Sequence, residues 1–233
     1  MVTPMVTTIA TMVVGGAAAA TYAALHRNST LFGPVLARLP GDGRRIALTF
    51  DDGPTPEATP RLLDLLGRTG VSATFFLLGR HVERWPSIAR RVHDEGHLVA
   101  NHGFAHQRLH FAGPRAALAD IRRGSDAIAA ATGVRPAHFR HPHGSRSPFV
   151  TPAAASLGER TVGWSYAARD WERPGAGEIA RRVVAAARPG AIVLLHDGDG
   201  YDPRGDRLQT VEAVALLIPA LRDRGFDFAL LPP

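Results

Sequence analysis

The chain has 233 residues, of which 45% are hydrophobic, and it contains no cysteine. This length and composition suit one globular domain with a sizeable core, and the missing cysteine excludes disulfides, thiolate metal sites and cysteine nucleophiles. The formal net charge of +6 comes from 27 basic residues, all of them arginines. These arginines are scattered over predicted helix faces, with no basic run interleaved with aromatic residues, so we expect no nucleic-acid partner.

The N-terminus is apolar. Residues 1–25 carry no charged side chain, and residues 5–25 are long enough to cross a bilayer. We therefore expect residues 1–27 to be a signal peptide or a membrane anchor, with membrane contact through residues 5–25. This would make the protein extracytoplasmic, either secreted or anchored at the cell surface. No basic residue precedes the apolar run, and Arg27 follows it. By the positive-inside rule, this distribution of charge argues against placing the domain outside the cytoplasm.

A linker is expected next, over residues 28–43. The backbone breakers Pro34, Pro40 and Gly41 lie in this segment. The folded domain is then expected to occupy residues 44–233.

Short apolar runs alternate with helical stretches beyond the linker. The predicted strands are residues 46–50, 73–78, 98–100, 137–140, 161–166, 191–195 and 226–231. Apolar residues three and four positions apart predict helices over residues 59–68, 85–95, 115–131, 148–157, 177–187 and 206–224. Seven strands alternating with helices predict an α/β fold with a parallel sheet, for which a barrel is a plausible closure. The C-terminal strand ends would then share one face, where the active sites of such barrels lie.

Polar and titratable side chains follow nearly every predicted strand, whereas the strand bodies are apolar. They are Asp51 and Asp52 after the first strand, Asn101, His102 and His106 after the third, Arg140, His141 and His143 after the fourth, Asp170 after the fifth, and His196 and Asp197 after the sixth. A structural scaffold does not need such residues at these places. Together they predict a catalytic rim.

The pair His102 and His106 is a candidate for metal binding. Two histidines four residues apart face the same way on a helical turn, and a carboxylate from the Asp51–Asp52 pair would complete a set of two histidines and one carboxylate. Such a set leaves coordination positions open, as a catalytic metal site requires. Nitrogen and oxygen ligands fit Zn²⁺ best, with Co²⁺, Mn²⁺ and Ni²⁺ as alternatives.

His196 is a candidate general acid, because histidine titrates near neutral pH. Asp170 is the carboxylate that would hold it protonated and oriented. Arg140 would keep a catalytic carboxylate ionised, since a nearby cation lowers the pKa of a carboxyl group.

These motifs resemble those of the polysaccharide deacetylase family, the NodB-homology domain of carbohydrate esterase family four. The family motif TFDDG stands at residues 49–53, H-[ST]-x-x-H is matched at 102–106, R-x-P-Y is approximated at 140–143, an Asp-Trp pair stands at 170–171, and a Leu-x-x-His-Asp-like strand end lies at 192–197. The match covers about residues 44–231 with all motifs in family order. It implies a distorted (β/α)7 TIM-like barrel of the polysaccharide deacetylase type.

The resemblance implies roles on the metal side of the site. Asp51 would be the general base for the attacking water, with Arg140 orienting it. Asp52, His102 and His106 would bind the metal.

On the other side, the resemblance makes His196 the general acid, tuned by Asp170. Trp171 and Leu194 would wall the pocket for the acetyl methyl group. The backbone N–H of His143 would bind the oxyanion.

The implied activity is metal-dependent hydrolysis of the N-acetyl group of N-acetylglucosamine-type residues, in peptidoglycan or a chitin-like glycan, by a monomer. Two alternatives stay open: a metal-dependent amidohydrolase on a non-sugar amide, and a catalytically silent carbohydrate-binding surface protein. The silent protein should have lost Asp51 or His196, and both are present.

The sequence departs from the family pattern at two positions. Gly103 replaces the Ser or Thr between the histidines, so we expect a looser metal loop. His143 replaces the Tyr of the third motif, which alters the aromatic surface offered to the sugar.

Overall fold

The structure is a computed structural model that describes residue 18, residues 20–41 and residues 43–233. The predicted signal peptide or anchor therefore falls largely outside the described residues. Within the described part of the chain, no helix has the length and apolar character of a membrane span.

The described chain alternates strands and helices, as the sequence predicted. The strands are β1 (Arg45–Asp51), β2 (Thr74–Leu77), β3 (Leu98–Asn101), β4 (His138–Phe139), β5 (Arg160–Thr161), β6 (Tyr166–Ala167), β7 (Ala191–His196) and β8 (Asp227–Phe228). The α-helices are α2 (Thr59–Thr69), α3 (Gly79–Arg84), α4 (Pro86–Asp94), α5 (Pro114–Thr132), α6 (Val150–Ser156), α7 (Ala176–Ala186) and α8 (Leu208–Asp223). Short 3-10 turns occupy Leu109–Phe111, Pro142–Gly144 and Asp170–Glu172. Helix α3 was not predicted, because six residues are too few to display a helical period.

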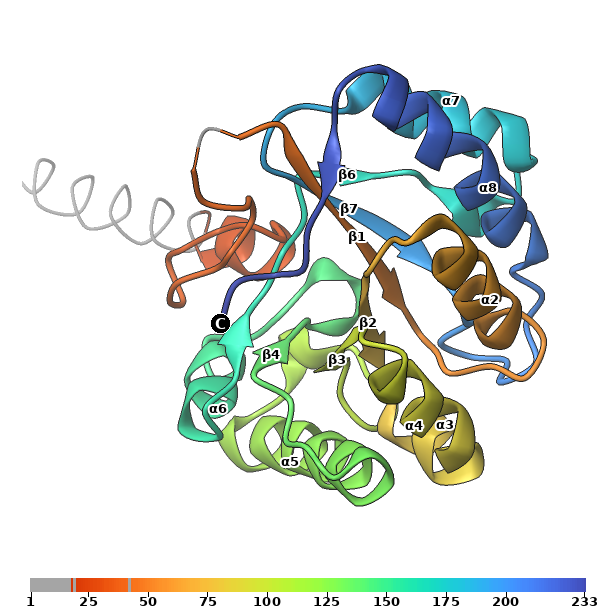
Figure 1. The fold of residues 1–233 in the computed structure, drawn as a ribbon. Coiled ribbons are helices and arrows are strands. Elements are labelled where there is room, and N and C mark those ends of the chain that lie inside the picture. Colours follow the sequence, from red (N-terminus) through yellow and green to blue (C-terminus); the bar gives the residue numbers. More distant parts are fainter. Residues whose placement is uncertain (1–17, 19, 42) are drawn as a thin grey trace, which may run out of the picture.

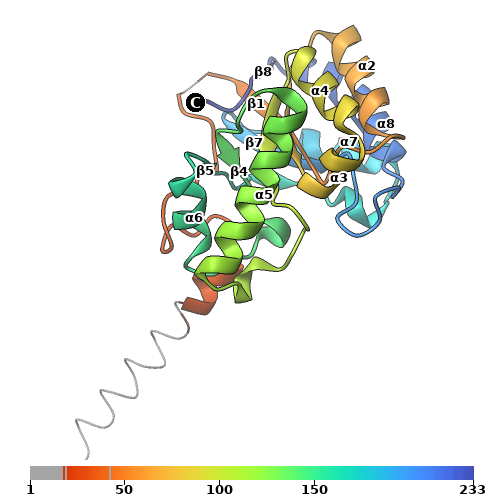
Figure 2. The same ribbon diagram turned by 90° about the horizontal axis from the view of Figure 1, so that it is seen from below.

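The strands form a curled, parallel half-barrel in the order β5-β4-β3-β2-β1-β7-β6, and β8 adds to β1. The helices lie around the outside of this sheet, with α6 on the opposite side of the molecule from α2 and α8 in both views (Figures 1 and 2). The predicted (β/α)7 architecture is therefore confirmed. Parallel pairing places all C-terminal strand ends at one edge of the sheet.

Strand β1 divides its side chains between two layers, because successive residues point to opposite faces. Ile46, Leu48 and Phe50 pack into the large core between the sheet and the outer helices. Ala47 packs into a smaller inner cluster. The same alternation turns Asp51, the last residue of β1, toward the inside of the half-barrel.

The predicted strand 161–166 is wrong as a single element. Residues 160–161 pair with β4 as β5, and residues 166–167 pair with β7 as β6, so the run bridges the two ends of the sheet. Strand structure is interrupted over residues 163–165, and a Cβ at Gly163 would lie 2.1 Å from Oδ1 of Asn28. One apolar run thus serves both edges of the half-barrel.

The segment predicted as a linker packs into the gap between these edges. The N–H of Leu36 donates to the carbonyl of Thr161, and the N–H of Leu39 donates to the carbonyl of Gly190. Both leucine side chains belong to the inner cluster, which also contains Leu231 near the C-terminus. The C-terminus lies beside this N-terminal segment (Figure 1).

Candidate active site

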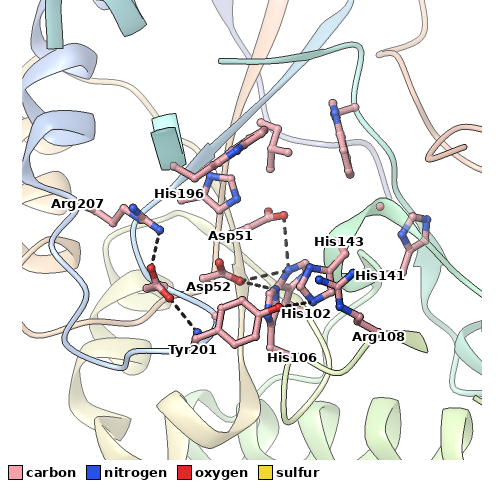
Figure 3. Close-up of a pocket in the computed structure, with 16 residues that line it drawn as sticks. Asp51, Asp52, His102, His106, Arg108, His141, His143, His196, Tyr201 and Arg207 are labelled. Carbon is pink, nitrogen blue, oxygen red and sulfur yellow. Dashed lines mark hydrogen bonds and ion pairs between the residues drawn. The ribbon is translucent and has the colours of Figure 1, made fainter. Parts of the chain in front are cut away.

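Register brings the two catalytic candidates of β1 and β7 side by side. The Cα of Asp51 is the pairing partner of the Cα of His196. Figure 3 shows the carboxylates of Asp51 and Asp52 between His196 on one side and the histidines His102 and His106 on the other. The predicted meeting of strand ends therefore occurs.

Three of these side chains form a candidate metal centre. Oδ1 of Asp52 lies 3.4 Å from Nε2 of His102 and 3.2 Å from Nε2 of His106. The ligand atoms of the three residues lie within 4.8 Å of one another, and all three residues are buried. The expected helical turn is wrong: His102 to His106 is a loop after β3, and His106 has a φ of 56°.

The chemistry of this donor set fits a cation. Nδ1–H of His102 donates to the carbonyl of Arg140 over 2.8 Å, which turns its Nε2 toward Asp52. Oδ1 of Asp52 is buried and accepts no hydrogen bond within the described chain. Burial lowers the pKa of His106 to about 3, so its imidazole is neutral. A carboxylate oxygen and two imidazole nitrogens that converge in this way are suited to a divalent ion.

The backbone of Asp52 has an unusual conformation and is hydrogen-bonded by His81. Its φ is 73°, in the left-handed region, which turns its side chain away from the strand direction. Nδ1–H of His81, at the first turn of α3, donates to its carbonyl over 2.8 Å. His81 was not identified from the sequence, because a histidine in a short unpredicted helix carries no pattern.

Asp51 is paired with a buried cation. Nη1 of Arg140 lies 2.6 Å from Oδ1 of Asp51 and also donates to Thr49, and Nη2 donates to the carbonyl of Gly163. The guanidinium is fully buried and stacks on the ring of Phe76, 4.0 Å from its centroid. A buried arginine with these contacts places a positive charge against Oδ1 of Asp51 and orients its carboxylate.

His196 is paired with a buried anion. Its Nδ1 donates to Oδ1 of Asp170 over 2.9 Å, and its backbone N–H donates to Oδ2 of the same carboxylate. The hydroxyl of Thr210 also donates to Oδ2. Burial by itself would lower the pKa of His196, but the charge and hydrogen bond of Asp170 outweigh it and raise the pKa to about 9. Asp51 thus faces a buried cation, whereas His196 faces a buried anion.

A cavity of about 530 Å³ opens over these groups. Leu194 and Trp171 form part of its wall, and the indole of Trp171 meets the imidazole of His196 edge-on, with ring centroids 5.4 Å apart. His143 also lines it, with its ring 4.3 Å from that of His106. Arg140 and Asp170 do not line the cavity, but each contacts a residue that does, Asp51 and His196 respectively.

The sequence interpretation missed Tyr201. This residue is 69% exposed at the rim, and its ring meets that of His106 edge-on with centroids 5.5 Å apart. Asp199 holds the loop in place by accepting from the N–H of Tyr201 and pairing with Arg207 (Figure 3). An aromatic residue in a long polar loop directly after His196 was the signal available.

Comparison with known proteins agrees with this geometry. A family model described as polysaccharide deacetylase matches residues 38–162. A chitooligosaccharide deacetylase of Rhizobium leguminosarum bv. trifolii is 46% identical over 82% of this chain and 92% of its own. A peptidoglycan-N-acetylglucosamine deacetylase of Bacillus cereus is 38% identical over 84% of this chain and 90% of its own.

A solved structure shares the fold as well. It is a peptidoglycan N-acetylglucosamine deacetylase in complex with 4-naphthalen-1-yl-N-oxidanyl-benzamide, with a TM-score of 0.80 and 32% identity over 85% of this chain and 91% of that one. The matches in sequence and in fold agree. The chain therefore belongs to the polysaccharide deacetylase family.

Proposed function

We propose that this chain is a metal-dependent hydrolase that removes the N-acetyl group from N-acetylglucosamine-type residues of a glycan. One observation carries the proposal: Asp51 and His196 are direct neighbours in the sheet, yet one is paired with Arg140 and the other with Asp170. A carboxylate paired with a cation and an imidazole whose pKa is raised by an anion thus stand beside one candidate metal centre.

The two residues divide the proton transfers of amide hydrolysis. Asp51 accepts a proton from the water that attacks the acetamide carbonyl carbon. The carbon–nitrogen bond then breaks, and His196 donates its Nε2 proton to the amine nitrogen. The products are acetate and a free amino sugar, and the backbone N–H of His143 is the proposed donor to the oxyanion.

Asp52, His102 and His106 are the proposed metal ligands. A divalent cation held by these residues would polarise the acetyl carbonyl and lower the pKa of a water molecule bound to it. Zn²⁺ is the proposed ion, because it favours imidazole and carboxylate ligands with open positions, and Co²⁺, Mn²⁺ and Ni²⁺ are the alternatives.

The rim of the cavity supports a sugar polymer as substrate. Trp171 and Tyr201 present exposed aromatic faces there, 42% and 69% accessible, and Leu194 with Trp171 offers a small apolar wall for the acetyl methyl group. Peptidoglycan and chitin-like oligomers both contain the required N-acetylglucosamine unit. We take the enzyme to act on one of these as a monomer.

Export is part of the proposal. The uncharged residues 1–25 support either secretion or anchoring at the cell surface, where these glycans lie. Cell fractionation tests it, and recovery of the whole protein in the cytoplasm would contradict it.

The deciding experiment is acetate release by the purified, metal-loaded protein from chitooligomers, peptidoglycan and acetylxylan. Activity on the first two should disappear with a chelator and return with Zn²⁺ or Co²⁺. Asp51→Asn and His106→Ala should each abolish turnover, whereas Asp64→Asn, an exposed acid paired with Arg91, should not. Wild-type rates in the His106→Ala protein would overturn the proposal, and activity confined to non-sugar amides would reassign the substrate.

A further inference from the structure

The loop between the two candidate ligand histidines contains no regular secondary structure. Gly103 has a φ of 78° and His106 a φ of 56°. A loop of this kind does not fix the separation of two imidazoles by itself, as a helical turn would. The contacts of residues 103–105 must therefore hold the geometry of His102 and His106.

Side chains bind every backbone N–H between the histidines. The N–H of Gly103 donates to Oδ1 of Asn101 over 2.8 Å. The N–H of Phe104 donates to one oxygen of the Asp120 carboxylate over 3.1 Å, and that of Ala105 donates to the other over 3.2 Å. Asp120 lies on α5 and is buried. One carboxylate thus clamps two consecutive amides of the loop.

Two carbonyls of the same loop accept hydrogen bonds from backbone N–H groups of α3. The N–H of Gly79 donates to the carbonyl of Gly103 over 2.9 Å, and the N–H of Arg80 donates to the carbonyl of Phe104 over 3.2 Å. Gly79 and Arg80 form the first turn of α3, where backbone N–H groups have no partner within the helix. The loop is therefore fixed between α3 and α5.

Close packing makes residues 103 and 120 depend on each other. A Cβ at position 103 would lie 2.5 Å from Oδ2 of Asp120, and a Cβ at Gly124 would lie 2.8 Å from the carbonyl carbon of Gly103. The Asp120 carboxylate thus occupies the space into which a Ser or Thr at position 103 would project. The looser loop expected from Gly103 is not what these contacts indicate.

We propose that Asp120 is the positioning residue of the metal loop, and that Gly103 and Asp120 form a matched pair in which the carboxylate supplies the restraint that a hydroxyl at position 103 would otherwise give. This inference rests on the proposed metal site. Loss of the carboxylate releases two loop amides and lets the His106 ring move away from Asp52. The consequence is weaker metal binding in a protein that remains folded.

The test measures metal affinity directly, by competition of the metal-free full chain with a chromogenic chelator for Zn²⁺ and Co²⁺. Asp120→Ala and Asp120→Asn should weaken binding about 10- to 100-fold, as expected for residues that orient metal ligands. The visible absorption of the Co²⁺ protein should change as well. Asp126→Asn is the matched control, because Asp126 lies on the same helix but is exposed and pairs with Arg135, and its affinity should stay at the wild-type value.

A merely structural role for Asp120 predicts a different pattern. The melting temperature would then fall, while metal affinity and the Co²⁺ spectrum measured well below it would stay unchanged, which would overturn the inference. A wild-type protein without metal affinity would instead overturn the proposed function.

A double-mutant cycle tests the pairing. Gly103→Ala should weaken metal binding strongly in the wild-type background, because its Cβ collides with the carboxylate. Its effect should be several-fold smaller in the Asp120→Ala background, where only backbone strain remains. Equal effects in both backgrounds would refute the matched pair.

Discussion

Asp170→Asn tests whether the carboxylate behind His196 sets the protonation state of the proposed acid. The substitution keeps the size of the side chain and removes its charge. Both oxygens of Asp170 accept hydrogen bonds from His196, one from Nδ1 and one from the backbone N–H. An asparagine has only one acceptor to offer, so one of these donors loses its partner.

The magnitude follows from the pKa of His196, which rises from 6.5 to about 9 in the folded protein. Each pKa unit corresponds to about 1.4 kcal/mol, so the net shift corresponds to on the order of 3 kcal/mol; burial opposes it, and Asp170 contributes more to it than Asp52 and Asp51 do. Because the pKa is raised on folding, this stabilisation is fully present below pH 6.5 and is lost as the pH rises through about 9. Asp170→Asn should therefore lose most of it at pH 6.

The assay is the pH dependence of kcat/KM for acetate release from a chitooligomer at saturating metal. His196 must be protonated to act, so the alkaline limb reports its pKa, and it should move down by roughly 2 pH units in Asp170→Asn. A bound cation lowers the absolute value in both proteins, so the difference between them is decisive. Glu172→Gln is the control, since this nearby acid faces Arg169 instead of His196. Coincident alkaline limbs in Asp170→Asn and the wild type would refute the reasoning.

Four further predictions use other parts of the molecule. Asp52→Ala should weaken Zn²⁺ binding by more than about 100-fold in a chelator competition, because it removes the anionic ligand; unchanged affinity would exclude it as a ligand. Burial raises the pKa of Glu159 from 4.5 to about 8, so the stability that depends on its protonated form is lost as the pH rises through this range. Glu159→Gln cannot titrate, so the free energy of unfolding measured in urea should change by a few kcal/mol less over this range than in the wild type. Identical pH profiles of the two proteins would contradict this. Tyr201→Ala should raise KM for a chitooligomer about 3- to 10-fold with little change in kcat, which equal KM values would disprove. Leu36→Ala should cost about 2 to 3 kcal/mol in urea unfolding because the side chain fills the inner cluster, whereas a free linker would show less than about 0.5 kcal/mol.

The strand ends were predictable because apolar runs and titratable residues alternate in the sequence. Once the sheet is parallel, Asp51 and His196 must share an edge, and the structure places them in register. Longer elements such as α5 and α8 were located closely for the same reason: many turns of helix repeat one pattern.

The differences lie where long-range packing overrides local pattern. The run over residues 161–166 has one continuous apolar pattern, yet it is divided between two sheet edges because residues 36–39 occupy the space between them. The spacing of His102 and His106 suits a helix equally well, but a loop forms, because α3 and the Asp120 carboxylate bind its peptide groups. Neither partner is close in sequence, so local periodicity could not indicate them.

The inner cluster has a consequence for how this domain folds. It joins Leu36 and Leu39, from before the first strand, to Leu231 at the end of the chain, and the carbonyl of Pro232 accepts a hydrogen bond from His138. Contacts between such distant parts of the chain raise the contact order and slow folding, because a long loop must close before they form. The inner cluster of the half-barrel therefore cannot be completed until Leu231 has been synthesised.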